Sequence, residues 1–114
     1  MRFTAEEPDV SQLRKGVVEL AVLGLLSRGR RYGSQLVDEL ASYPGLAISA
    51  GTVYPLLARL RKGGLVEAHW EESPVGPPRK FYSLTARGEQ VLASMTSAWA
   101  SLAADLTTIL QENR

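Results

Sequence analysis

Apolar residues recur at intervals of three and four positions in the first part of the chain, which is the spacing of an amphipathic helix. The first run predicts a helix over residues 9–27, and Asp9 and Gln12 at its start have the spacing of a capping box. Its recurring apolar residues are Leu13, Val17, Leu20, Ala21 and Leu25. A second run predicts a short helix over residues 33–42, because Pro44 cannot continue it.

A third predicted helix follows Ser49, a residue type that caps helix N-termini well. It ends at Gly63 and Gly64. Pro55 lies beyond the first turn of this helix, where it removes one backbone hydrogen bond, so we expect a loosened or bent start. The apolar face consists of Val53, Leu56, Leu57 and Leu60.

After the glycines the spacing changes to alternation, which is typical of a strand with one buried face. Val66, Ala68 and Trp70 alternate with charged or polar residues and predict a strand over residues 65–71. Residues 79–84 resume a strand pattern after a proline-rich stretch. The two strands therefore form a predicted hairpin with a stiff tip.

The last segment predicts one long helix over residues 85–112, capped by Thr85. A helix of about 27 residues is about 40 Å long, which is long for so small a domain. Its apolar residues repeat at intervals of three and four positions, as in a seam against another helix: Leu92, Met95, Trp99, Leu102, Leu106 and Ile109. Because such a seam must be covered, we expect a two-fold homodimer; packing within the monomer is the alternative.

Three helices followed by a two-stranded hairpin are the order of the winged helix-turn-helix, whose third helix enters the major groove of DNA beside the hairpin. The predicted fold is therefore mainly α with a small β-hairpin: a winged helix-turn-helix with a long C-terminal dimerisation helix. We divide the chain accordingly into a DNA-binding domain, residues 9–84, and a dimerisation helix, residues 85–112.

The residue types in the third helix and at the hairpin suit contact with double-stranded DNA. Hydroxyl groups near the start of the helix can hydrogen-bond to phosphates or base edges, and a glycine there lets the backbone approach closely. Cations on the later turns and at the wing can follow the phosphate backbone or the minor groove. The candidate DNA-binding residues are Ser49, Gly51, Thr52, Tyr54, Arg59, Arg79 and Lys80.

The distribution of charge supports this prediction. The chain has 114 residues and a net charge of +1, yet residues 28–88 hold nine Lys and Arg against five Asp and Glu. The segments on either side are slightly acidic, so a polyanion is attracted to the middle of the chain. Scattered, solvated charge without a partner is the alternative interpretation.

Chemistry other than binding finds little support in the residues. His69 is the only histidine, it lies in a charged strand, and the chain contains no cysteine. Motifs for nucleophilic, acid-base, nucleotide or metal chemistry are missing, so we expect no catalytic residue, no metal site and no cofactor. The lack of cysteine, of a long apolar run and of a basic leader predicts a cytoplasmic protein without membrane contact.

Two stretches of this sequence resemble the PadR family of bacterial transcriptional regulators. They are Gly51-Thr52-Val53-Tyr54-Pro55-Leu56-Leu57-Ala58-Arg59-Leu60 and Arg79-Lys80-Phe81-Tyr82-Ser83-Leu84-Thr85 with Gly88. The resemblance covers about residues 13–110 and includes Pro55, since tyrosine-proline is common at that place in the family. It implies a winged-helix repressor that dimerises through its C-terminal helix and is relieved by small molecules. The chain is similar to the short branch of the family, which ends with this helix.

Trp99 is large for a seam position. It resembles the tryptophan that multidrug-binding members of the short branch present in their dimer pore, where flat aromatic ligands stack. That resemblance implies a site for a planar aromatic or drug-like ligand at Trp99 and Met95, in which stacked indole rings hold the ligand. The alternative, that Trp99 only fills the seam, stays open.

Two hypotheses for function follow. In the first, the protein is a cytoplasmic homodimeric repressor that binds an inverted-repeat DNA operator and releases it when a small molecule binds. In the second, the winged helix serves protein interaction or effector-independent DNA binding, and the long helix is purely structural. The cations of the third helix and the wing favour DNA over a protein partner.

Overall fold

Four α-helices, a 3₁₀ turn and three short strands make up the part of the chain that the computed structural model describes, residues 10–112. In chain order they are α1 (Ser11–Leu26), β1 (Arg31–Tyr32), α2 (Gly33–Ala41), η1 (Pro44–Leu46), α3 (Ala50–Lys62), β2 (Val66–Glu71), β3 (Arg79–Leu84) and α4 (Ala86–Glu112). Every predicted helix and strand is confirmed, with ends that differ by at most two residues. Asp9, the predicted cap of the first helix, lies outside the described residues.

The core lies where α1, α2 and α3 meet. Its fully buried side chains are Val22, Leu23, Leu36, Leu40, Val53 and Leu57. On α3 these belong to the predicted apolar face. On α1 the buried face is instead centred on Val22 and Leu23, while Leu13 of the predicted face is 64% exposed. The sequence pattern of α1 is apolar around much of its circumference, so spacing alone did not identify the buried side.

The hairpin of β2 and β3 is part of a three-stranded antiparallel sheet with the order β1-β3-β2. The two residues of β1, which no sequence pattern predicted, pair with β3: Arg31 lies opposite Tyr82, and Tyr32 lies opposite Phe81. The side chain of Arg31 also forms an ion pair with Glu39 of α2, 2.5 Å long. The predicted small β-hairpin is thus joined to the helical core by an added edge strand.

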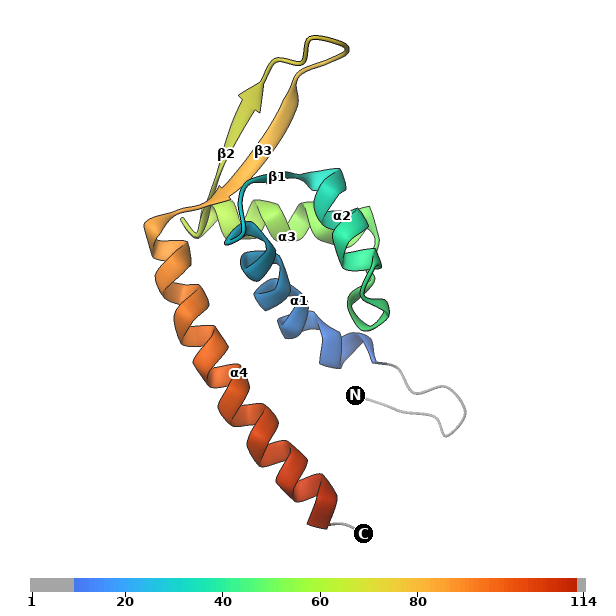
Figure 1. The fold of residues 1–114 in the computed structure, drawn as a ribbon, viewed down its shortest axis with the longest axis vertical. Coiled ribbons are helices and arrows are strands. Elements are labelled where there is room, and N and C mark those ends of the chain that lie inside the picture. Colours follow the sequence, from blue (N-terminus) through green and yellow to red (C-terminus); the bar gives the residue numbers. More distant parts are fainter. Residues whose placement is uncertain (1–9, 113–114) are drawn as a thin grey trace.

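The hairpin projects away from the helices at one end of the molecule (Figure 1). Along β2, Val66 is buried, Ala68 is half-buried and Trp70 is 69% exposed. The alternation that predicted a buried face holds near the core and fails further out, because the strand leaves the core before it reaches Trp70. The projecting hairpin is the wing of the fold.

The third helix runs as one uninterrupted α-helix through Pro55. Ser49 occupies the N-cap position with extended backbone, φ −78° and ψ 160°, as predicted, but within residues 10–112 its side chain makes no capping hydrogen bond. The helix ends at Gly63, and Gly64 takes the left-handed conformation with φ +78°, which favours glycine.

The last helix starts against the core and then leaves it. Thr85 caps α4, because its Oγ1 accepts a hydrogen bond of 3.0 Å from the backbone N–H of Gly88. A Cβ at Gly88 would collide with the backbone carbonyl of Leu65, so glycine permits the close approach of α4 to this turn. Leu92 and Met95 are half-buried against the core. The first turns of α4 therefore belong to the helical domain, which blurs the predicted boundary between residues 9–84 and the dimerisation helix.

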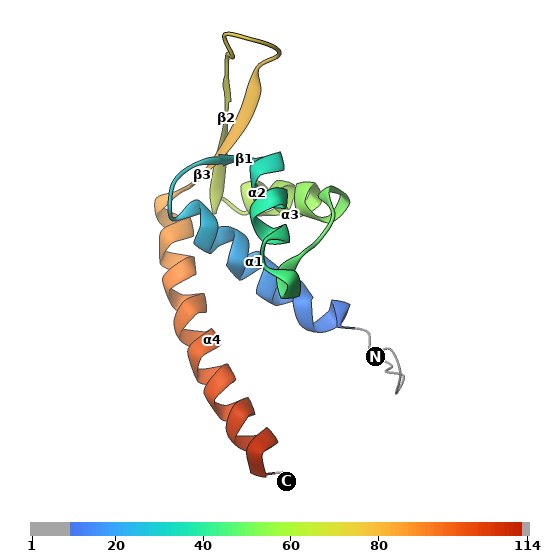
Figure 2. The same cartoon turned by 45° about the vertical axis from the view of Figure 1, so that its right-hand side comes forward.

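The C-terminal half of α4 diverges from α1 and continues away from the rest of the molecule in both views (Figure 1 and Figure 2). With the wing at the opposite end, the protein is 58 Å long and 22 Å thick. Nothing in the described part of the protomer covers the apolar residues on the outer half of α4. Their exposed fractions are 47% for Trp99, 66% for Leu102, 54% for Leu106 and 56% for Ile109.

Candidate nucleic-acid interface

The surface of α3 that faces away from the core is built from small and polar residues. Its buried face is formed by the four predicted residues, so the remaining positions are exposed. At 100° per residue, the positions most directly opposite the core are Gly51, Pro55, Ala58 and Lys62. Three of these four side chains are small, so α3 presents a low ridge that can enter a groove.

Gly51 is not required by the fold. A Cβ at this position would meet only Ser49 Oγ, at 3.5 Å, among the described residues, which is an ordinary contact. Its backbone is not in the left-handed region either, since the residues with positive φ are glycines elsewhere. Glycine weakens a helix relative to alanine. Within the described residues the fold gives no reason for glycine at this position, and the role of Gly51 in close approach to a partner stays a prediction.

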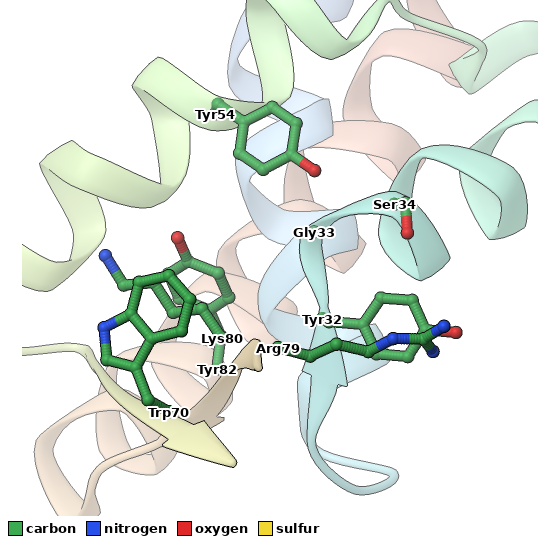
Figure 3. Close-up of a pocket in the computed structure, with 8 residues that line it drawn as sticks. All are labelled: Tyr32, Gly33, Ser34, Tyr54, Trp70, Arg79, Lys80 and Tyr82. Carbon is green, nitrogen blue, oxygen red and sulfur yellow. The ribbon is translucent and has the colours of Figure 1, made fainter. Parts of the chain in front are cut away.

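On one side of the ridge, α3, the wing and the start of α2 enclose an open basin of about 550 Å³ (Figure 3). Three predicted DNA-binding residues line it: Tyr54 from α3, and Arg79 and Lys80 from β3. The other lining residues are Tyr32, Gly33, Ser34, Trp70 and Tyr82. The structure thus brings together the hydroxyl group and the two cations that the sequence placed in separate segments.

The two wing cations are held by aromatic rings. The guanidinium of Arg79 lies 4.6 Å from the ring centre of Tyr32. The ammonium of Lys80 lies 5.8 Å from the ring of Trp70 and 5.7 Å from that of Tyr82. These cation–π contacts reduce the conformational freedom of both side chains and leave their charge available to an anion.

Glu71 does not neutralise Arg79, although the two residues are cross-strand partners. Its carboxylate Oε1 instead pairs with Arg30 Nη1 at 2.6 Å. Within residues 10–112 neither Arg79 nor Lys80 forms an ion pair. The basin therefore keeps a positive potential that favours a phosphate group.

The ring of Tyr54 lies against the start of α2. Figure 3 shows its hydroxyl pointing toward Gly33 and Ser34. A Cβ at Gly33 would come within 2.7 Å of the Tyr54 hydroxyl oxygen, so glycine at this place lets the ring lie against the backbone. The hydroxyl is thereby held beside the N-terminus of α2, where backbone N–H groups favour negative charge.

Tyr82 forms the inner wall of the basin and is only 7% exposed. Burial raises the pKa of its hydroxyl above the usual 10.0; the nearby Tyr54 raises this pKa further, and Arg61 opposes the rise. Tyr82 therefore stays neutral at physiological pH. Its ring forms an apolar wall of the basin and makes the cation–π contact with the ammonium of Lys80.

On the other side of the ridge, α3 and α1 border a second depression of about 490 Å³. The remaining polar candidates of α3 line it: Ser49, Thr52 and Arg59. Arg14 and Lys15 of α1 add two cations. The candidate residues of α3 are thus divided between two neighbouring hollows, one shared with the wing and one shared with α1.

Sequence reasoning missed the aromatic residues that hold the wing cations and the two cations of α1. Trp70 was assigned to a half-buried strand face, and Tyr32 belonged to no predicted element. The two cations followed directly by two aromatic residues at positions 79–82 were a usable signal for cation–π contacts at the wing. Arg14 and Lys15 gave no signal, because only the packing of α1 brings them beside α3.

Comparison with known proteins decides the class of protein. Residues 22–94 match the model of the family described as "Transcriptional regulator PadR-like family". The chain belongs to this family. The resemblance found in the sequence motifs is therefore confirmed, and so is the winged-helix fold with its long C-terminal helix.

Solved structures of other PadR-like regulators have the same fold. A PadR family transcriptional regulator from Eggerthella lenta is 37% identical, with a TM-score of 0.80 over 89% of this chain and 88% of that chain. A PadR-like transcriptional regulator from Bacillus cereus is 34% identical, with a TM-score of 0.80 over 89% of this chain and 98% of that chain. An uncharacterized protein of Lysinibacillus sphaericus is 27% identical over 94 residues, which are 81% of this chain and 86% of that protein.

Membership of the family settles the broad function. PadR-like proteins are DNA-binding transcriptional regulators and not enzymes, and they generally act as dimers. The part of the second hypothesis in which the winged helix serves protein interaction is therefore set aside, and effector-independent DNA binding stays as the alternative to ligand release. Within residues 10–112, acidic and histidine side chains nowhere gather in a group that could hold a metal ion. None of the helices in that range is long and apolar enough to cross a membrane.

Proposed function

We propose that this PadR-like regulator is a homodimeric repressor that binds an inverted-repeat operator through α3 and the wing of each protomer. The observation that carries the proposal is the basin between α3 and the wing, where Tyr54, Arg79 and Lys80 meet beside a ridge of small residues. A winged helix docks on duplex DNA by placing a helix in the major groove while cations on either side of that helix contact the phosphates. The ridge and the flanking cations fit this arrangement.

The residues divide into two roles in this proposal. Gly51 and Thr52 lie on the first turns of α3 and approach the base edges, with Ser49 at the helix start. Arg59, Arg79 and Lys80 contact phosphates on either side of the groove, which fixes the position of α3 on the duplex. The Tyr54 hydroxyl is held beside the start of α2. There it contacts the same phosphate as the backbone N–H groups at the N-terminus of α2.

The outer half of α4 supports the homodimer. Trp99, Leu102, Leu106 and Ile109 form an apolar stripe that is about half exposed or more at each position. Leu13 on α1 is equally uncovered. A second copy of the chain, related by a two-fold axis, covers these residues in both protomers at once. Leu92 and Met95, which we placed in the same seam, pack partly against the protomer's own core and continue the stripe inward.

The two-fold axis has a consequence for the operator. Two copies of α3 related by the axis read two half-sites in opposite orientation, so the operator is an inverted repeat. Selection of duplexes from a random-sequence pool by the purified protein should return such repeats. A selected sequence with a single half-site would contradict the dimeric docking.

The DNA contacts are tested with a double variant, Arg79→Ala with Lys80→Ala, bound to the selected duplex at several salt concentrations. We expect the slope of log affinity against log salt to fall by about one unit for each lost phosphate contact. Arg28→Ala with Arg87→Ala removes the same charge from exposed sites outside the basin and serves as the matched control. Equal slopes for the two double variants would contradict the proposed role of the wing.

We also propose a ligand site at Trp99 and Met95, where a planar aromatic or drug-like molecule stacks between the indoles of the two protomers and releases the DNA. The exposed Trp99 lies one turn beyond Met95 on α4 and supports this proposal. In the Trp70→Phe variant, Trp99 is the only tryptophan, so a ligand at the seam should quench its emission. Unchanged fluorescence with a panel of planar dyes would show that Trp99 only packs.

A further inference from the structure

The ridge of α3 is apolar along most of its length. Gly51, Pro55 and Ala58 lie within about 60° of one another around the helix axis, and all three are exposed. Their side chains hold no hydrogen-bond donor or acceptor. Between Gly51 and Ala58, the side chains of the ridge can therefore recognise a partner by apolar contact and not by hydrogen bonds.

The polar side chains of α3 lie to either side of this ridge. At 100° per residue, Tyr54 is about 70° from the centre of the ridge on the side of the wing, and Arg59 is about 70° from it on the side of α1. The Tyr54 hydroxyl points toward Gly33 and Ser34 (Figure 3). The guanidinium Nη2 of Arg59 lies 4.0 Å from the carboxylate Oε2 of Glu19. These two polar groups therefore suit phosphates beside a groove better than base edges at its floor.

The location of Pro55 suits contact with a partner. Proline inside a helix removes one backbone hydrogen bond and weakens the helix, and the exposed ring of Pro55 does not offset this by packing in the core. Proline and alanine side chains have no rotamer freedom to lose when they are covered. Pro55 and Ala58 are therefore rigid apolar surfaces that can be buried against a partner at little cost in entropy.

The major groove of DNA offers one apolar group at its base edges, the C5-methyl of thymine. Contact between this methyl group and an apolar side chain removes apolar surface of both partners from water. An apolar ridge over a G·C pair would instead take the cytosine amino group and the guanine oxygen out of water without giving them a partner. A ridge of this composition therefore favours thymine over cytosine and guanine.

The spacing along α3 fits two successive base pairs. Pro55 and Ala58 are three residues apart, which is a rise of about 4.5 Å along the helix. Successive bases of one strand are about 3.4 Å apart along the axis of the duplex. When the helix lies along the groove, the two side chains therefore meet neighbouring base pairs.

We propose that Pro55 and Ala58 determine the sequence preference of this regulator by contacting the methyl groups of thymines on neighbouring base pairs in each half-site. The inference rests on the function proposed above, in which α3 enters the major groove, and it names the bases that the helix prefers. Gly51, one turn earlier, lets the helix approach closely enough for both contacts. The cations beside the ridge hold the phosphates and contribute affinity that does not depend on sequence.

The experiment replaces thymines of the selected duplex by uracil, one position at a time. Uracil lacks the C5-methyl group and pairs with adenine as thymine does. Burial of one methyl group is worth about fourfold in affinity, so binding measured by fluorescence anisotropy should weaken by about two- to fivefold at two neighbouring thymines of a half-site. Uracil outside the half-sites is the control and should leave the affinity unchanged. Selected half-sites without neighbouring thymines, or equal affinity for all uracil duplexes, would overturn the proposal.

A second set of duplexes separates the methyl group from the base pair. Replacing T·A by C·G at either contacted position should weaken binding. The base 5-methylcytosine restores the methyl group without restoring the T·A pair, and it should bind about two- to fivefold more tightly than cytosine at the same position. Equal binding of the two cytosine duplexes would contradict the methyl contact.

Variants assign each thymine to a side chain. In Ala58→Gly the ratio of affinities for the thymine and uracil duplexes should fall to about one at one of the two positions. Pro55→Ala, which removes most of the ring and favours the helix, should lower the ratio at the other position. Ala41→Gly removes the same methyl group as Ala58→Gly from an exposed site at the end of α2, and it should leave both ratios unchanged. Each ratio compares two duplexes on one variant, so a change in the stability of the protein cancels.

The outcomes separate this inference from the proposed function. Uracil penalties that persist unchanged in Ala58→Gly and Pro55→Ala would move the methyl contacts to other side chains and overturn the assignment. Uracil duplexes that bind as tightly as the thymine duplex, with a salt dependence that still falls in Arg79→Ala with Lys80→Ala, would overturn the inference and leave the proposed function standing. Failure to bind any duplex would contradict the proposed function, and this inference with it.

Discussion

Replacing Gly51 by alanine should stabilise the protein and weaken its binding to DNA. The added Cβ would lie 3.5 Å from Ser49 Oγ and near no other atom of the described chain, so the fold accepts it without strain. Alanine is favoured over glycine in a helix by about 0.5–1 kcal/mol. We expect a gain in the free energy of unfolding of about this size, or a rise in Tm of about 2–4 °C.

The effect on DNA has the opposite sign. In the proposed complex the first turn of α3 lies in the major groove, and a methyl group at Gly51 stands between the backbone and the base edges. The helix must then dock further out, which weakens the neighbouring contacts of Thr52 and Tyr54. The loss of one good base contact is worth about 1–3 kcal/mol, so affinity should fall by about five- to hundredfold.

Urea denaturation measures the first effect, and fluorescence anisotropy with the selected duplex measures the second. Gly16→Ala is the matched control, because Gly16 is an exposed glycine inside α1 with open space around its Cβ in the described structure. It should gain similar stability without losing DNA affinity. If Gly51→Ala binds the duplex as tightly as the wild type, the first turn of α3 does not approach DNA and the docking proposed here is wrong.

Three further predictions concern the dimer, the junction of α4 and the wing. Leu102→Glu places a carboxylate in the apolar stripe and should convert the dimer to a monomer in light scattering, at a cost of several kcal/mol in the dimerisation free energy; a wild-type protein that is already monomeric would refute the dimer. Gly88→Ala forces α4 away from the carbonyl of Leu65 and should lower the free energy of unfolding by about 1–3 kcal/mol. Gly45→Ala is the control and should cause no such loss, because a Cβ at Gly45 would have no described atom within 4 Å. Burial raises the pKa of Tyr82, so the folded protein retains a proton that the unfolded chain releases near pH 10.0. The free energy of unfolding should therefore fall as the pH rises above 10.0, and it should fall less in Tyr82→Phe. Urea denaturation below and above pH 10.0 measures the difference.

Local periodicity was sufficient to predict the helices and the wing. The spacing of Val53, Leu56, Leu57 and Leu60 corresponds to one face of α3, and all four are buried. The periods of a helix and of a strand are properties of the backbone. The spacing of apolar residues along the chain therefore predicts which segments are helices and which are strands. The short motifs around Tyr54 and Arg79 are also local features of the sequence, and they were sufficient to indicate the family.

The buried side of α1 could not be predicted in this way. Leu13 and Val22 are both apolar, yet Leu13 is largely exposed and Val22 is fully buried. The difference arises because other elements, among them α4, β3 and η1, pack against α1, whereas within the described protomer Leu13 stays largely uncovered. Burial of a residue in an apolar helix depends on which neighbours reach it, which is a tertiary property.

The candidate site shows the same division. Residue types and spacing selected Thr52, Tyr54, Arg59, Arg79 and Lys80 as one group, but packing places them in two hollows on opposite sides of α3. Arg79 lies over Tyr32 of β1 and Lys80 over Trp70 of β2, because cation–π contacts of this kind require side chains that are distant along the chain to meet in space. Composition and local order thus specify which chemistry is available to this regulator, and only the packing of α1, α2 and the wing around α3 determines which groups act together.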